Sequence, residues 1–348
     1  MQKTVKVDTS QGIYEVLIGR DLQVGELLKN LHKSCHVVVV SDDTVFSLYG
    51  EKCVSSLEAN GFLVDKFIFP HGEESKNIHV AEEILEFCGE VHMTRSDLLL
   101  ALGGGVVGDI TGFCAAIYAR GIDFVQVPTT LLAAVDSSVG GKTAIDLKSG
   151  KNLAGAFHQP IGVFLDVNTF DTLPKATFAE GMAEAIKYGM IYDESLFELF
   201  EKDDYDIITI CQRCIGIKAE VVHIDEFDKD LRRILNFGHT PGHAIEKLSH
   251  FGVSHGNAVA MGMVMMTRAS EKQGMIKEGS TDRLIKVLEK NSLPISTEYK
   301  AADMAEASLS DKKRMGGKLG LVLLDKLGHA CINEIPVEEL EKYYSMGL

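Results

Sequence analysis

Residues 98–109 constrain the fold of this chain most strongly, because an apolar run leads directly into a cluster of glycines. Residues 98–102 are all leucine or alanine and predict a strand, and a helical pattern follows the glycines. Gly103, Gly104 and Gly105 predict a tight turn, since glycine adopts backbone angles closed to other residues. The first N–H groups of the next helix would favour an anion such as phosphate. The alternative is a turn that only packs against its neighbours, because G-x-G-x-x-G alone is a weak signal.

A parallel α/β sheet is expected over the first half of the chain, because strand-like and helical segments alternate there. The β-branched run at residues 37–40 is typical of a strand buried on both faces. Ligands of such sheets lie beyond the carboxyl ends of the strands, where Asp42, the three glycines, Thr129 and Thr130 fall. Further strands are predicted at residues 4–7, 14–18, 62–69, 124–127 and 161–167, and a helix at residues 78–91.

The character of the chain changes near residue 174. Most of the second half has helical apolar spacing, apart from a hairpin expected at residues 319–324 and 330–335. The predicted fold class is an α/β N-terminal Rossmann-like domain with a mainly parallel sheet, followed by a mostly α-helical domain. We expect these domains at residues 1–174 and 175–348, which suits a length of 348 residues.

Charge and cysteine content exclude several classes of protein. The formal net charge of −15 argues against nucleic acid as the main partner. The seven cysteines are scattered without a C-x-x-C pair, which favours thiols in a reducing cytoplasm over a disulfide framework. No apolar run approaches membrane-spanning length, so we expect no membrane partner.

A carboxylate and a lysine three residues apart mark a helix predicted at residues 178–190. Glu184 and Lys187 share one face of that helix, and small or apolar residues surround Glu184. One interpretation is a surface ion pair. The other is a functional acid, because a carboxylate in such surroundings is costly unless it is paired or bound to a cation.

Three histidines near predicted helix starts suggest a metal site. His239 and His243 are four residues apart, and His255 precedes an apolar helix at residues 259–266. Pro241 complicates the first pair, because it would make Thr240 the N-cap and leave His239 in the preceding turn. With Glu184, the histidines fit a catalytic zinc site that has three protein ligands and an open position. The spacing leaves open which two histidines bind; His223 and His250 are expected on the surface.

Lysines and glycines gather between residues 139 and 152, and further cations occur later in the chain. Each lysine alone is best explained as solvated surface, but together such loops suit an anionic, oxygen-rich substrate. The sequence around Lys142 resembles the end of an ATP-binding P-loop, yet the required glycine is absent because residue 137 is serine, and that motif is excluded. The cations are Lys142, Lys151, Lys218, Arg232 and Lys312.

These motifs together resemble the 3-dehydroquinate synthase family, in the family's order and over nearly the whole chain. The most telling segments are residues 103–109, 118–121, 128–133, 136–142, 151–152, 184–187, 235–239 with His243, 255–256 and 311–313. The resemblance implies an NAD-binding N-terminal domain, a helical C-terminal domain, an active site between them, and a homodimer.

The resemblance also implies roles for individual residues. By position, Glu184, His239 and His255 would bind one divalent metal ion, zinc or cobalt, and His243 would contact the substrate instead. NAD would be held by Asp42, Glu73, Lys76, Gly103, Gly104, Gly105, Asp109, Thr129, Thr130, Lys142 and Lys151. The substrate would contact Asp136, Lys142, Asn152, Lys187, Lys218, Arg232, Asn236, His243 and Lys312, and the neighbouring subunit's substrate phosphate would contact Arg120. Asp228 and Pro241 depart from the family pattern, which has glutamate and a bulky apolar residue there.

The implied activity converts a sugar phosphate, 3-deoxy-D-arabino-heptulosonate 7-phosphate, to 3-dehydroquinate and phosphate in the shikimate pathway. NAD would oxidise the substrate transiently, phosphate would leave, the hydride would return, and an intramolecular aldol step would close the ring. The alternatives are another sugar-phosphate cyclase, a metal-dependent oxidoreductase of the glycerol dehydrogenase type, and a non-catalytic binding protein. Resemblance to the dehydrogenases would lead us to expect aspartate at the position of Glu184.

Overall fold

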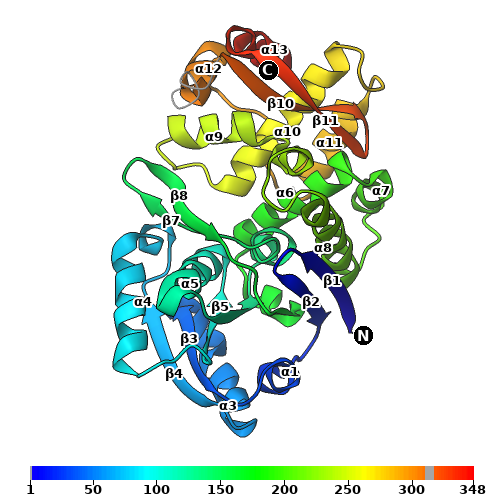
Figure 1. The fold of residues 1–348 in the computed structure, drawn as a ribbon. Coiled ribbons are helices and arrows are strands. Elements are labelled where there is room, and N and C mark those ends of the chain that lie inside the picture. The colour runs from blue at the N-terminus through cyan, green and yellow to red at the C-terminus, as the bar shows by residue number, and fades with distance from the viewer. Residues whose placement is uncertain (1, 310–316) are drawn as a thin grey trace. The chain divides into compact units, whose positions relative to one another are not determined.

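The computed structural model describes residues 2–309 and 317–348 (Figure 1). The chain divides into two compact units, Met1–Leu173 with Ile207–Phe227 and Pro174–Asp206 with Asp228–Leu348. The segment 207–227, which we expected in the helical domain, belongs to the first unit because its helix α8 (Ile207–Ile224) packs against strand β1 (Lys3–Thr9). None of the helices in the described ranges combines the length and apolarity that a membrane span needs.

The first unit contains a large sheet, a separate hairpin and the helices that cover them. The remaining sheet strands are β2 (Gly12–Gly19), β3 (His36–Asp42), β4 (Leu63–Phe69), β5 (Leu98–Gly103), β6 (Asp123–Pro128) and β9 (Gly162–Asp166), and the hairpin is β7 (Lys142–Leu147) with β8 (Gly150–Phe157). The other α-helices are α1 (Val24–Leu31), α2 (Asp43–Val45), α3 (Glu51–Ala59), α4 (Ile78–Glu90) and α5 (Gly105–Ile117). Short 3-10 or π turns are η1 (Phe46–Gly50), η2 (Glu73–Ser75), η3 (Tyr118–Arg120), η4 (Ala133–Ser137) and η5 (Val167–Thr172).

The large sheet has the order β1-β2-β9-β6-β5-β3-β4. β1 and β2, which contain the strands predicted at residues 4–7 and 14–18, pair antiparallel as a hairpin, and the other neighbouring pairs run parallel. The mainly parallel α/β sheet expected from the alternation of strands and helices is therefore confirmed.

Alternate residues of β3 pack into two apolar cores, one on each face of the sheet. Val38 and Val40 of β3 pack with α4 and α5, whereas Val37 and Val39 pack with α1 and α3. All four valines are fully buried, which confirms the prediction of a strand covered on both faces. Because β3, β5 and β6 pair in parallel, their carboxyl ends meet at one edge of the sheet.

The predicted glycine turn joins β5 to α5, but the physical reason for its glycines differs from the one we expected. Gly103, Gly104 and Gly105 all lie outside the left-handed region of backbone conformation. Space is what requires glycine, because a Cβ on Gly103 would lie 2.5 Å from Cγ2 of Val107. The turn is therefore tight through close packing and not through unusual backbone angles.

The basic, glycine-rich stretch between residues 139 and 152 lies mostly in the two strands β7 and β8 instead of the loop that we expected. β7 and β8 pair antiparallel, and Lys142 stands opposite Phe157. Ile145 is fully buried in the core that α4 and α5 share, which anchors the hairpin. Gly155 lets the two strands approach, since a Cβ there would lie 2.4 Å from the carbonyl oxygen of Thr143.

The second unit is mostly α-helical, with one antiparallel hairpin near its end, as predicted. Its strands are β10 (Lys318–Lys326) and β11 (His329–Pro336). Its helices are α6 (Lys175–Ile191), α7 (Glu194–Lys202), α9 (His239–Leu248), α10 (His255–Lys272), α11 (Ser280–Lys290), α12 (Ala301–Leu309) and α13 (Leu340–Gly347), with 3-10 turns η6 (Leu231–Asn236) and η7 (Val337–Glu339). The mostly buried helix α10 packs against α6, α9, α11 and α13, and His255 is its first residue.

Candidate metal centre and cofactor site

Glu184 lies in the middle of α6, where nearly every residue is buried. Its carboxylate is fully buried and forms an ion pair with Lys187, which is also inaccessible to solvent. The interpretation as a surface ion pair is therefore wrong. Two charges removed from water in this way are costly unless their mutual attraction and further hydrogen bonds compensate for the lost solvation.

His239 is the first residue of α9, and Gly238 is the N-cap. Gly238 has a φ of 76°, and a Cβ there would lie 2.8 Å from the backbone nitrogen of Met263 in α10. The prediction of Thr240 as the N-cap is wrong, because this close approach of the turn to α10 starts the helix earlier. Pro241 fits the first helical turn, where backbone N–H groups have no partner within the helix.

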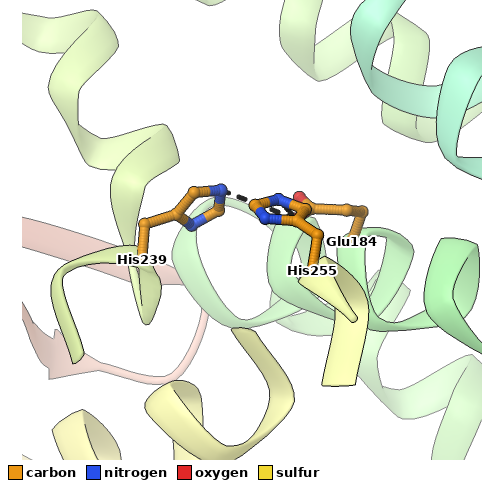
Figure 2. Close-up of side chains that lie close together, drawn as sticks. All are labelled: Glu184, His239 and His255. Atoms are coloured by element: carbon orange, nitrogen blue, oxygen red, sulfur yellow. Dashed lines mark ion pairs between the residues drawn. The ribbon is translucent and has the colours of Figure 1, made fainter. Parts of the chain in front are cut away.

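Two imidazoles converge on the buried carboxylate (Figure 2). Nε2 of His239 lies 3.6 Å and Nε2 of His255 lies 3.5 Å from Oε1 of Glu184. Two donor atoms each about 2.1 Å from a tetrahedral zinc ion lie about 3.4 Å apart. The described residues thus hold a carboxylate and two imidazoles at the spacing of ligands to one ion, with one donor atom of each within 4.8 Å of the others.

The environments of the two imidazoles differ. Burial, helped by the charge of Lys187, lowers the pKa of His239 to about 3, so this ring is neutral at physiological pH and able to bind a metal. Burial opposes the charged form of His255 as well, but hydrogen bonds with Glu184 and Glu246 outweigh it and raise the pKa of His255 to about 10. Without a metal, the two carboxylates therefore favour the positively charged form of His255, which carries a proton on both ring nitrogens.

His243 lies beside this group and not within it. Its side chain is exposed, and its ring centroid is 5.6 Å from that of His239 and 6.0 Å from that of His255. Its Nε2 lies 4.0 Å from Oε2 of Glu246, whereas Glu184 is approached by the other two histidines. The spacing of the sequence left the two ligands open, and the structure places His239 and His255 around Glu184.

A second polar cluster in the first unit joins residues expected to bind NAD with one expected to bind substrate. The buried Nζ of Lys76 lies 2.6 Å from Oδ2 of Asp109 and 2.6 Å from Oδ1 of Asn152. Burial disfavours the charged lysine, but Asp109 outweighs it and holds the pKa of Lys76 above its usual value. Lys151 lies 3.4 Å from Glu73 in the same neighbourhood.

The carboxyl edge of the sheet gathers the other residues expected at the cofactor. Asp42 ends β3 and caps α2 by accepting a hydrogen bond from the backbone N–H of Val45. A Cβ on Gly104 would lie 3.1 Å from Cγ2 of Thr130, and the N–H of Thr129 donates to the carbonyl oxygen of Gly103. The glycine turn and the two threonines are therefore in contact.

The residues expected at the substrate are divided between the two units. In the first unit, the buried Nζ of Lys218 lies 2.5 Å from Oδ1 and 2.6 Å from the carbonyl oxygen of Asp136, while Lys142 and Arg120 are exposed. In the second unit, Arg232 is buried and Asn236 is exposed in η6. Lys312 lies outside the described residues. Asp228, which we expected to depart from the family pattern, has a φ of 57°.

Sequence reasoning gave no role to Glu246, although it lies next to His255. Its Oε1 is 3.4 Å from Nδ1 of His255. Part of the signal was present in the sequence, because Glu246 follows His243 by three residues on the helix predicted after Thr240, which places these two on one face.

Comparison with known proteins matches both parts of the chain. Residues 66–180 match the family described as 3-dehydroquinate synthase N-terminal, and residues 181–314 match 3-dehydroquinate synthase C-terminal. A 3-dehydroquinate synthase of Streptococcus suis (strain 05ZYH33) is 45% identical over 345 residues, which cover 95% of this chain and 96% of that protein.

Two solved structures extend the comparison. A 2-deoxy-scyllo-inosose synthase, solved with carbaglucose-6-phosphate, NAD+ and Co2+, has a TM-score of 0.89 at 24% identity and covers 99% of this chain and 100% of its own. A 2-epi-5-epi-valiolone synthase of Streptomyces hygroscopicus subsp. jinggangensis 5008, solved with NAD+ and Zn2+, has a TM-score of 0.87 at 25% identity and covers 96% of each chain. At 24% identity, the likeness to the 2-deoxy-scyllo-inosose synthase shows the fold alone.

Proposed function

This chain belongs to the 3-dehydroquinate synthase family, and on that basis we propose that it converts 3-deoxy-D-arabino-heptulosonate 7-phosphate to 3-dehydroquinate and inorganic phosphate. The observation that carries the proposal is 45% identity with a 3-dehydroquinate synthase along 95% of the chain. The chain is then a carbon–oxygen lyase of the shikimate pathway, which leads to the aromatic amino acids.

We propose that Glu184, His239 and His255 hold one divalent ion, zinc or cobalt. The donor set of one carboxylate and two imidazoles suits such an ion, and the distances of 3.5 and 3.6 Å around Oε1 of Glu184 support it. When bound, the ion supplies Lewis acidity toward the substrate's hydroxyl groups. Lys187 balances the charge of Glu184, and burial keeps His239 neutral.

NAD is proposed to bind in the first unit. It supplies a hydride acceptor that is restored within each turnover. No side chain in the described structure caps α5, so the N–H groups at its start can donate to a pyrophosphate. Lys76 holds the carboxylate of Asp109 in place. The other residues assigned to NAD are Asp42, Glu73, Gly103, Gly104, Gly105, Thr129, Thr130, Lys142 and Lys151.

The substrate is proposed to be held through its two anionic ends, its carboxylate and its phosphate. Cationic side chains recognise such groups by charge and by charge-assisted hydrogen bonds. Holding both ends of one flexible molecule restricts its conformations before the reaction. Asp136 places the ammonium group of Lys218, and the remaining residues assigned to the substrate are Lys142, Asn152, Lys187, Arg232, Asn236, His243 and Lys312.

The proposal extends to assembly and location. A homodimer would allow the exposed Arg120 of one subunit to contact the substrate phosphate of the other. The cytoplasm is the proposed location, since scattered cysteines without a C-x-x-C pair suit a reducing compartment.

The decisive experiment supplies the heptulosonate phosphate with a trace of NAD and measures phosphate release and NADH absorbance. We expect phosphate far in excess of NAD, no net NADH, loss of activity with a chelator and recovery with zinc. Accumulation of NADH would favour the dehydrogenase, and phosphate release only from a hexose phosphate without a carboxylate would favour another cyclase. His239→Ala should abolish the reaction, whereas His223→Ala, which changes an exposed histidine, should leave it intact.

A further inference from the structure

A buried carboxylate without an assigned role lies beside the metal-site histidines. Glu246 is on α9, and 5% of the residue is exposed. A carboxylate withdrawn from water is costly unless charges or hydrogen bonds compensate it. One of its two oxygens lies beside the ring of His255, and the other lies on the side of His243.

The ring of His255 stands between two carboxylates, one for each nitrogen. Its Nδ1 lies 3.4 Å from Oε1 of Glu246, and its Nε2 lies 3.5 Å from Oε1 of Glu184. A neutral imidazole carries one proton, and its other nitrogen offers a lone pair. A proton on Nδ1 that faces Glu246 leaves Nε2 available on the side of Glu184.

His239 has the same arrangement with a different partner. Its Nδ1 lies 3.1 Å from the carbonyl oxygen of Phe237, and its Nε2 faces Glu184. A carbonyl oxygen only accepts hydrogen bonds, so the proton of this ring is on Nδ1. Both rings therefore present Nε2 to one point, one backed by a neutral carbonyl and the other by an acid.

The backbone restrains Glu246 in this position. Its carbonyl oxygen accepts hydrogen bonds from the N–H of Phe251 at 2.7 Å and from Oγ of Ser249 at 2.9 Å. These hydrogen bonds join the backbone of Glu246 to the turn that follows α9. Its Oε2, 4.0 Å from Nε2 of His243, also connects the metal centre with a residue proposed to contact the substrate.

We propose that Glu246 is a positioning residue of the metal centre, which holds His255 with its proton on Nδ1 and directs Nε2 toward the ion. The inference rests on the proposed function, since it requires an ion at Glu184, His239 and His255. A carboxylate behind a ligating histidine orients the ring and raises its basicity. His243, Glu246 and His255 also lie close enough to hold an ion, but filling both sites together would require both nitrogens of His255 to be without a proton at once.

The test measures zinc affinity of the full chain by competition with a chromophoric chelator. Glu246→Ala should lower the affinity about 10–100-fold, and Glu246→Gln should lower it less, because an amide oxygen still accepts a hydrogen bond from Nδ1. Glu271→Gln is the matched control: it alters a partly buried carboxylate of the same unit that accepts hydrogen bonds from Gly279 and Thr281, and zinc affinity should not change.

A second measurement separates positioning from a general structural role. Nitrogen NMR of the zinc-loaded chain should show His255 protonated at Nδ1, with this signal shifted in Glu246→Gln. Unchanged affinity and an unchanged His255 signal would overturn the proposal, and so would two zinc ions per wild-type chain. Retention of zinc in Glu184→Ala and His239→Ala would instead overturn the proposed metal centre. Should Glu246→Ala fail to fold, the Gln variant decides.

Discussion

Lys187 and Glu184 form an ion pair inside the protein, one turn apart on α6, with exposed fractions of 1% and 0%. Lys187→Met leaves the carboxylate buried without this lysine. We expect the free energy of unfolding of the metal-free chain to fall by about 3–5 kcal/mol. With zinc bound the loss should be smaller, because the ion supplies positive charge to Glu184.

Urea unfolding with a chelator and with zinc measures the two losses. Lys202→Ala is the control, since it breaks an exposed pair with Glu198 and should change nothing measurable. Equal losses with and without zinc would contradict a metal at Glu184.

Replacement of single histidines should separate ligands from neighbours. His239→Ala should lose zinc on dialysis. His243→Ala should keep one ion per chain, because its ring lies outside the group around Glu184. The His243 variant should still lose activity, because His243 is proposed to contact the substrate. Metal analysis of the dialysed proteins checks this. Zinc loss from the His243 variant, with zinc kept by the His239 variant, would reverse the assignment.

Gly238 should be a glycine on which the proposed metal centre depends. Gly238→Ala places a side chain at a φ of 76°, at a cost of about 1–2 kcal/mol, and adds a contact of 2.8 Å with the backbone of Met263. We expect further destabilisation and weaker zinc binding, because His239 follows directly. Gly279→Ala has a similar φ of 86° with nothing within 4 Å of its Cβ, so it should show the conformational cost alone and normal zinc affinity.

Asp97 should make the stability of the first unit sensitive to acid. Burial alone would raise the pKa of Asp97, but hydrogen bonds from Thr94 and from the backbone of His36 outweigh it and hold the pKa below its usual value. A lowered pKa in the folded state stabilises the protein fully above the unfolded pKa of about 3.9, and this contribution disappears as the pH falls through the folded value.

Asp97→Asn should therefore lower the free energy of unfolding by about 1.5–3 kcal/mol at neutral pH. The difference from the wild type should shrink in acid, below the folded pKa of Asp97. Urea unfolding over a series of pH values checks this, and a difference independent of pH would contradict the charge-based explanation.

The sheet could be predicted from the sequence because its signals are local. Residues 37–40 are apolar and β-branched at every position, which is typical of a strand covered on both faces. The hairpin of β7 and β8 was missed because its composition is that of a loop. Its pairing depends on the burial of Ile145 and the close approach at Gly155, which are properties of the packed unit.

The residues of the proposed metal centre could be suggested by type from the sequence, but their arrangement could not. Pro241 suggested a helix that starts after His239, and the actual start is set by contact between Gly238 and α10, which is distant in sequence. Burial of Lys187 and the role of Glu246 likewise depend on which helix faces cover them. Local patterns carry no information on such long-range packing.

Helix α8 belongs to the first unit, although residues 174–206, which precede it in the chain, belong to the second. It covers β1 and supplies Lys218 to Asp136, so a fragment cut at residue 174 would lack part of its own interior and one partner of a buried ion pair. During synthesis, the amino-terminal unit remains incomplete until Phe227 has left the ribosome, and by then the first two helices of the other unit, α6 and α7, have already been made.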